Sequence, residues 1–266
     1  MNLQETMPRL PIHAPAHFRI IAHRGASAYA PENTLAAFEL AARMGATEIE
    51  TDAQLSRDGQ VLLCHDDTLE RYGHGAQRVE SMTAAALLAL DMGAWFSPFL
   101  YGGARMMTLD ALFHHFGPTF IYHIEIKGSA PGLEEAVAGL VAQYDLATQT
   151  VITSFRFDAL AQMHAHAPNL RLGWLVDSSD TPTLAQARQL PLFQLCPRAE
   201  FVTPAAVAAA RAIVPEVRAW GLTGSRAQTL ERITRVLAAG CDGMTIDWPD
   251  WVVAHAQPTE QTGATP

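Results

Sequence analysis

The sequence predicts an α/β protein built as a single TIM-type (β/α)8 barrel, and three observations support this prediction. Short β-branched or apolar segments alternate with Ala-rich amphipathic segments along the chain, as in parallel β/α units. The length of 266 residues suits one barrel, because such domains commonly use about 250 residues. The first strand leads into His23-Arg24-Gly25, whereas open doubly wound sheets usually begin with a glycine-rich phosphate loop.

Nine segments have the composition of buried strands, one more than a barrel of this kind needs. They are residues 18–23, 47–52, 61–65, 120–126, 150–153, 170–176, 192–196, 216–220 and 243–247. Amphipathic helices are predicted between most of them, at residues 33–44, 109–116, 132–144, 156–166, 183–190, 204–212 and 225–239. Helix starts are expected at Asn33, Thr108, Thr183 and Ser225, and helix ends at Gly45 and Gly240.

The chain is expected to divide into an N-terminal extension at residues 1–18, a barrel at 19–253 and a flexible tail at 254–266. The barrel pattern is interrupted at about residues 67–107, where glycines and aromatic residues replace the strand–helix alternation. We expect this insertion to form a small loop-and-helix cap beside the barrel mouth, with a short helix near 83–90, and to contribute to substrate selection.

Composition excludes several classes of protein. A chain that is 49% hydrophobic and 17% charged is not intrinsically disordered, and a net charge of −9 argues against nucleic-acid and anionic-membrane partners. Cys64, Cys196 and Cys241 are far apart in the sequence and predict buried free thiols. Without a signal-peptide pattern or a membrane-spanning apolar stretch, we expect a cytoplasmic protein with no stable membrane insertion.

Acids, bases and cations gather where the predicted strands end. They are His23, Arg24, Glu50, Asp52, His65, Asp66, Glu125, Lys127 and Asp247. Because the carboxyl ends of barrel strands form one rim, five chain segments should bring these side chains to the same place.

The spacing within two of these segments points to a metal site. Glu50 and Asp52 are two residues apart, as are Glu125 and Lys127, so each pair should share one face of its strand. Charges buried inside a barrel need a partner or a metal. Three carboxylates form an all-oxygen site suited to a hard divalent cation, Mg²⁺ or Ca²⁺, with Mn²⁺ as a further candidate.

These residues also belong to an ordered series of motifs that resembles the glycerophosphodiester phosphodiesterase family. The series runs from about residue 19 to 250. It comprises His23-Arg24-Gly25, Pro31-Glu32-Asn33-Thr34, Glu50-Thr51-Asp52, Ser56-Arg57-Asp58-Gly59, His65-Asp66, Met107-Thr108-Leu109, Ile124-Glu125-Ile126-Lys127, Ser154-Phe155, Trp220 and Asp242–Asp247.

The resemblance implies metal-dependent hydrolysis of glycerophosphodiesters to glycerol 3-phosphate and an alcohol, on a barrel with an insertion after the His-Asp motif. His23 and His65 would be the general acid and base, and Glu50, Asp52 and Glu125 would hold the cation. Arg24 and Lys127 would contact the phosphate, and Trp220 is a candidate to line the glycerol pocket. The sequence does not choose between a cyclic phosphate and direct attack by water, nor between the histidines as acid and base.

Smaller roles stay open at this stage. Asp66 either orients His65 or caps a turn, Asp247 is either a metal neighbour or a turn residue, and Asn33 is expected mainly to cap its helix. The sequence departs from the family pattern after Trp220, at residues 221–224, and at residues 72–74 and 123, which leaves the preferred alcohol undetermined.

Two alternative functions remain. One is a phospholipase-type barrel phosphodiesterase, which would call for an exposed apolar lip or a basic membrane face. The other is a barrel that binds phosphodiesters without catalysis, which would be expected to lack a metal ligand or a histidine, whereas all of them are present. The oligomeric state is not predicted.

Overall fold

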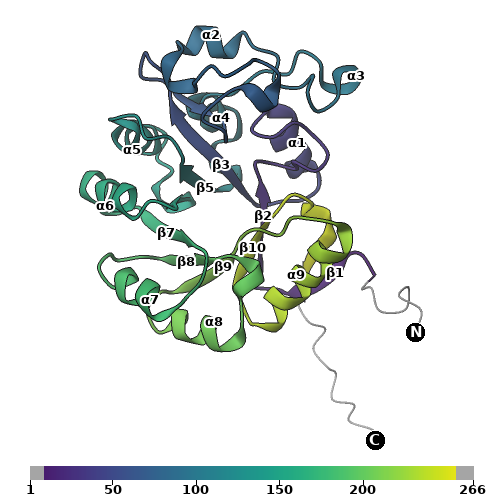
Figure 1. Ribbon diagram of the computed structural model, residues 1–266, viewed down its shortest axis with the longest axis vertical. Helices are drawn as coiled ribbons and strands as arrows, with labels where there is room; N and C mark the ends of the chain where they lie inside the picture. Colours follow the sequence, from purple (N-terminus) through teal and green to yellow (C-terminus); the bar gives the residue numbers. More distant parts are fainter. Residues whose placement is uncertain (1–8, 256–266) are drawn as a thin grey trace, which may run out of the picture.

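Eight parallel strands close into a barrel in the computed structural model, which describes residues 9–255 (Figure 1). The strands are β2 (Arg19–His23), β3 (Glu48–Leu55), β5 (Ile121–Ile126), β6 (Thr150–Ser154), β7 (Arg171–Val176), β8 (Gln194–Pro197), β9 (Glu216–Ala219) and β10 (Gly243–Ile246). The barrel closes because β2 pairs with both β3 and β10, with Ala22 beside Ile49 and Ile246. The predicted fold class is confirmed.

Seven helices follow the barrel strands on the outside. They are α1 (Leu35–Arg43), α4 (Leu109–Phe116), α5 (Leu133–Gln143), α6 (Phe157–His166), α7 (Thr181–Ala187), α8 (Pro204–Arg211) and α9 (Arg226–Ala238). Short 3-10 turns complete the connections: η3 (Gly117–Thr119), η4 (Ala147–Gln149), η5 (Ala199–Phe201) and η6 (Pro249–Trp251). α9 buries Leu230, Ile233 and Val236, a helical spacing that gives it one apolar face.

The predicted helix starts are partly correct. Thr108 and Ser225 cap α4 and α9 through their side chains. α7 begins earlier than predicted, because the Asp180 carboxylate accepts a hydrogen bond from the Thr183 amide and thereby caps the helix. Asn33 does not cap α1, whose N-cap is Thr34.

The predicted strand at residues 61–65, one more than the eight that a barrel needs, lies outside the barrel. β4 (Val61–Leu63) pairs antiparallel with the end of β3, with Leu63 opposite Ala53. The two strands form a hairpin because Gly59 adopts a left-handed φ of 82° and the Ser56 amide donates to the Gln60 carbonyl. β4 ends at Leu63, so His65 lies in the loop that follows and not at a barrel strand end.

Residues 67–107 fold above β3 in Figure 1, around a small apolar cluster that they share with Leu62 and Cys64. The elements are η1 (Glu70–Tyr72), η2 (Val79–Ser81), α2 (Ala84–Leu88) and α3 (Pro98–Tyr101). The cluster contains Leu62, Cys64, Leu69, Tyr72, Val79, Ala84, Leu87, Met92 and Met106. This cluster is separate from the barrel core, and the burial of its apolar side chains holds together a segment that contains no strand.

The two ends of the described chain pair with each other. β1 (Ile12–Pro15), from the predicted extension, runs parallel to β11 (Val252–His255). Residues 256–266 of the predicted tail lie outside the described residues. In the part that is described, no helix is long and apolar enough to span a membrane, and the three cysteines are buried and free, as predicted.

Candidate active site

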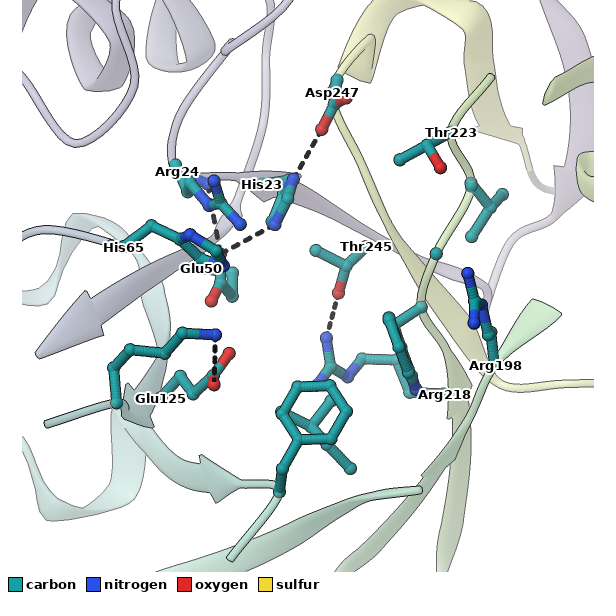
Figure 2. A pocket seen from close by; sticks show the side chains of 16 residues that line it. His23, Arg24, Glu50, His65, Glu125, Arg198, Arg218, Thr223, Thr245 and Asp247 are labelled. Carbon is teal, nitrogen blue, oxygen red and sulfur yellow. Dashed lines mark hydrogen bonds and ion pairs between the residues drawn. The ribbon is translucent and has the colours of Figure 1, made fainter. Parts of the chain in front are cut away.

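A pocket lies at the carboxyl ends of the barrel strands and collects most of the predicted site residues (Figure 2). His23, Arg24, Glu50, His65, Glu125, Lys127 and Trp220 all line it, and Asp52 is fully buried beside them. It is also lined by Phe155, Arg198, Arg218, Thr245 and Asp247. No residue of 67–107 lines this pocket within the described chain, and a contribution of the insertion to substrate selection stays a prediction.

The loop after β2 has an unusual backbone that brings its side chains into the pocket. Arg24 and Asn33 adopt left-handed φ values of 53° and 56°, which non-glycine residues rarely do. Between them Gly25 has a φ of 84°, and a Cβ there would lie 2.6 Å from the Ala37 carbonyl carbon. This close approach explains the glycine in the His-Arg-Gly motif. It also directs the Arg24 amide to Glu50, with a hydrogen bond of 3.2 Å.

Glu50, Asp52 and Glu125 present carboxylate oxygens that lie within 4.8 Å of one another. Burial and the neighbouring Asp52 raise the pKa of Glu50 and of Glu125. Burial also acts to raise the pKa of Asp52, but Arg24 and other cations outweigh it and hold that pKa below its usual value. Three converging acids in a buried site repel one another unless a cation joins them.

One buried oxygen of this cluster has no hydrogen-bond partner. Oδ2 of Asp52 accepts a hydrogen bond of 2.9 Å from Asn33 and lies 3.0 Å from Nε of Arg24, whereas Oδ1 is buried without a hydrogen bond. A buried carboxylate oxygen left free is costly. The three acids therefore fit a hard divalent cation, which would take the oxygens that the protein leaves unpaired. Asn33, expected mainly as a helix cap, instead donates to Asp52 and holds this carboxylate in the cluster.

Two cations flank the acids. The ammonium group of Lys127 lies 3.1 Å from Glu125, and Arg24 also reaches Glu32 at 3.0 Å. Both side chains line the pocket, so an anion bound there meets positive charge on two sides.

Each predicted catalytic histidine is held by a carboxylate through Nδ1. His23 lies 2.5 Å from Asp247, which also accepts a hydrogen bond from Ser27. His65 lies 2.5 Å from Asp66. A carboxylate at Nδ1 favours a proton there and leaves Nε2 as the acceptor in the neutral ring. Asp66 thus lies where it would orient His65, which was one of its two interpretations, whereas Asp247 contacts His23, a role that neither of its interpretations had included.

The two imidazoles lie in different electrostatic surroundings. Burial and the Arg24 guanidinium act to lower the pKa of His23, but the hydrogen bond with Asp247 and the charges of Glu50 and Asp247 raise it above the usual value. Burial lowers the pKa of His65 below the usual value, although the charge of Asp52 opposes the shift.

A second polar network joins the insertion to the site. Arg71 lies 2.7 Å from Asp66 and 2.6 Å from Glu32, and Tyr72 donates a hydrogen bond of 2.9 Å to Glu32. Asp66 is thereby held between His65 and Arg71. Arg71 was missed by sequence reasoning, since nothing around it in the sequence indicates this long-range pairing.

The opposite wall of the pocket is aromatic and basic. Phe155 and Trp220 pack edge to face with ring centroids 4.8 Å apart, and the Trp220 indole donates to the Val176 carbonyl. Arg198 and Arg218 lie beside them. Sequence reasoning missed both arginines. Arg218 carried a usable signal, because it precedes Trp220 by two residues and a charge at that position in a buried strand should face the barrel interior.

Comparisons with known proteins agree with this geometry. Residues 23–251 match the model of the glycerophosphoryl diester phosphodiesterase family. A glycerophosphodiester phosphodiesterase from Caldanaerobacter subterraneus is 32% identical over 238 residues, which cover 88% of this chain and 96% of the relative.

Solved structures give the same result. A glycerophosphodiester phosphodiesterase from Agrobacterium tumefaciens superposes with a TM-score of 0.72 and 28% identity, covering 88% of this chain and 98% of that one. A phosphodiesterase from Oleispira antarctica, in complex with the product sn-glycerol-3-phosphate, has a TM-score of 0.76 and 26% identity over 93% of this chain and 96% of that one. The chain therefore belongs to the glycerophosphoryl diester phosphodiesterase family of hydrolases.

Proposed function

We propose that the protein hydrolyses glycerophosphodiesters to glycerol 3-phosphate and an alcohol, with a divalent cation held by Glu50, Asp52 and Glu125. The observation that carries the proposal is the unpaired Oδ1 of Asp52 within a cluster of three buried acids. Membership of the family and the glycerol 3-phosphate in the Oleispira antarctica structure support the reaction.

The two histidines carry the proton transfers in this proposal. One imidazole takes the proton of the attacking oxygen, from water or from the glycerol hydroxyl, while the other gives a proton to the alcohol oxygen as its bond to phosphorus breaks. Asp247 and Asp66 hold Nδ1 of each ring, which leaves Nε2 to exchange protons with the substrate. If the glycerol hydroxyl attacks first, water then opens the cyclic phosphate by the same exchange of protons in reverse.

The charged side chains bind and orient the diester. Arg24 and Lys127 contact the non-bridging phosphate oxygens, whose negative charge grows as phosphorus is attacked. When bound, the cation adds Lewis-acid stabilisation of the same oxygens. Trp220 and Phe155 offer an apolar wall to the carbon skeleton of the substrate.

Metal binding and turnover can be tested separately. Metal-stripped protein is titrated with Mg²⁺, Ca²⁺ and Mn²⁺ by calorimetry, and release of glycerol 3-phosphate is then followed with each ion. We expect binding of at least one ion and turnover only in its presence, with both lost in Asp52→Asn. The matched control is Glu134→Gln, another buried acid, which pairs with Arg156 at 3.5 Å outside the pocket. Full activity after exhaustive chelation would contradict the metal-dependent reaction.

A further inference from the structure

Arg218 is a buried cation without an acidic partner. It extends from β9 into the barrel, is 2% exposed and lines the pocket. Its guanidinium donates to the Thr245 hydroxyl and to the Cys196 sulfur, and its Nε has no hydrogen bond. Within residues 9–255 no carboxylate lies within 4.0 Å of it. Buried charges are ordinarily paired, so this arrangement indicates that its anion comes from outside the protein.

Arg198 adds a second cation at the same end of the pocket. It follows β8 directly, and its guanidinium lies 5.4 Å from the centre of the Trp220 ring. The described acids leave this guanidinium unpaired as well. Gly221, with a φ of 77°, brings the backbone against this side chain, since a Cβ there would lie 3.1 Å from Cγ of Arg198.

Arg198 and Arg218 lie across the pocket from its acids. Figure 2 shows Arg198 and Arg218 on one side, with Thr245 beside Arg218, and Glu50 and Glu125 on the other. Arg24 and Lys127 lie with the acids, next to the histidines. A diester whose phosphate sits between the histidines therefore reaches the two unpaired arginines with another part of the molecule.

We propose that Arg198 and Arg218 form a second anion subsite, which binds an acidic group on the alcohol moiety of the diester. The preferred substrates are then glycerophosphodiesters whose head group carries a carboxylate or a phosphate, and cationic head groups are disfavoured. A guanidinium suits this role, because its planar donors match the oxygens of carboxylates and phosphates. The assignment rests on the hydrolysis proposed above.

A series of two-carbon head groups tests the charge preference at constant size. The substrates are the glycerol 3-phosphate esters of glycolate, ethylene glycol and ethanolamine, whose head groups are negative, neutral and positive. A hydrogen bond to a charged group corresponds to about a 10- to 150-fold difference. We expect kcat/KM for the glycolate ester to exceed that for the ethylene glycol ester by about this factor, and the ethanolamine ester to be poorest. The difference should lie mainly in KM, because the contact exists before and during reaction.

Variants assign the preference to the two arginines. Arg218→Met and Arg198→Met should each bring the ratio of glycolate to ethylene glycol ester close to one. The control is Arg171→Met, an arginine on the neighbouring strand β7 that bonds the Thr148 carbonyl outside the pocket and should leave the ratio unchanged. The Arg198 variant serves if Arg218→Met fails to fold.

The outcomes separate this subsite from the catalytic proposal. Failure of all three esters to turn over with any cation would refute the hydrolysis itself. Turnover without a charge preference would overturn the anion subsite alone. If Arg218→Met instead lowered kcat/KM equally for all three esters, the arginine would contact the common glycerol phosphate, and the head-group assignment would be wrong.

Discussion

Replacing Asp247 with asparagine tests whether the protein positions His23 through its Nδ1. The carboxylate lies 2.5 Å from that nitrogen and accepts a further hydrogen bond from Ser27. An asparagine amide can donate toward Nδ1 and would favour the tautomer with its proton on Nε2, which removes the acceptor from the pocket.

The magnitude follows from the contact that is lost. A hydrogen bond to a charged group contributes about 1.5–3 kcal/mol, or about 10- to 150-fold in rate. Inversion of the tautomer costs more, up to about 10⁴-fold in a comparable Asp–His pair. We therefore expect Asp247→Asn to lower kcat by about 10²–10⁴-fold.

The assay is release of glycerol 3-phosphate at saturating cation, together with Tm of each variant. Asp250→Asn is the control. Asp250 lies three residues after Asp247, accepts a hydrogen bond from the Tyr29 hydroxyl and does not line the pocket. Activity of Asp247→Asn within about threefold of the parent, with Tm unchanged, would refute the positioning role.

Three further predictions follow from the site and the barrel interior. His23→Ala and His65→Ala should each lower kcat by about 10²–10⁴-fold and retain metal binding in calorimetry, and the loss in the double variant should be much smaller than the product of the two single losses. A nitrophenyl ester, whose leaving group needs no proton, should restore activity only in the variant that lacks the acid. Small, equal losses on the natural and the nitrophenyl ester in both variants would contradict the two-histidine mechanism. Glu50→Gln should abolish metal binding yet raise Tm in chelator, because it removes one of three repelling carboxylates; a lower Tm would show that the acids do not repel in the metal-free protein. Burial lowers the pKa of His123 to about 4. The contribution of the neutral imidazole to the free energy of unfolding is therefore complete above the unfolded pKa of about 6.5 and falls by up to about 3 kcal/mol as pH drops to about 4. Denaturant unfolding of His123→Asn should lack this part of the pH dependence, and parallel pH profiles for the variant and the parent would contradict the prediction.

The fold and the first residues around the reacting centre could be predicted from the sequence, because both depend on local pattern. Alternation of strands and helices fixes a parallel barrel, and the carboxyl ends of its strands must share one rim. Glu50 and Asp52 share a face through the two-residue period of a strand. The structure brings them within reach of Glu125, as the spacing indicated.

Other features depended on contacts between residues far apart in the chain. His23 and Asp247 are 224 residues apart, and only closure of β2 against β10 brings them together. The antiparallel pairing of β4 likewise depends on β3 continuing past the barrel, which composition does not reveal. Arg218 is significant because no acid of the described chain lies within 4.0 Å of its guanidinium. Whether a charge is paired is a property of the packed interior, because any acidic residue of the sequence could have supplied the partner. Only the tertiary structure decided that no acidic residue of the described chain does so.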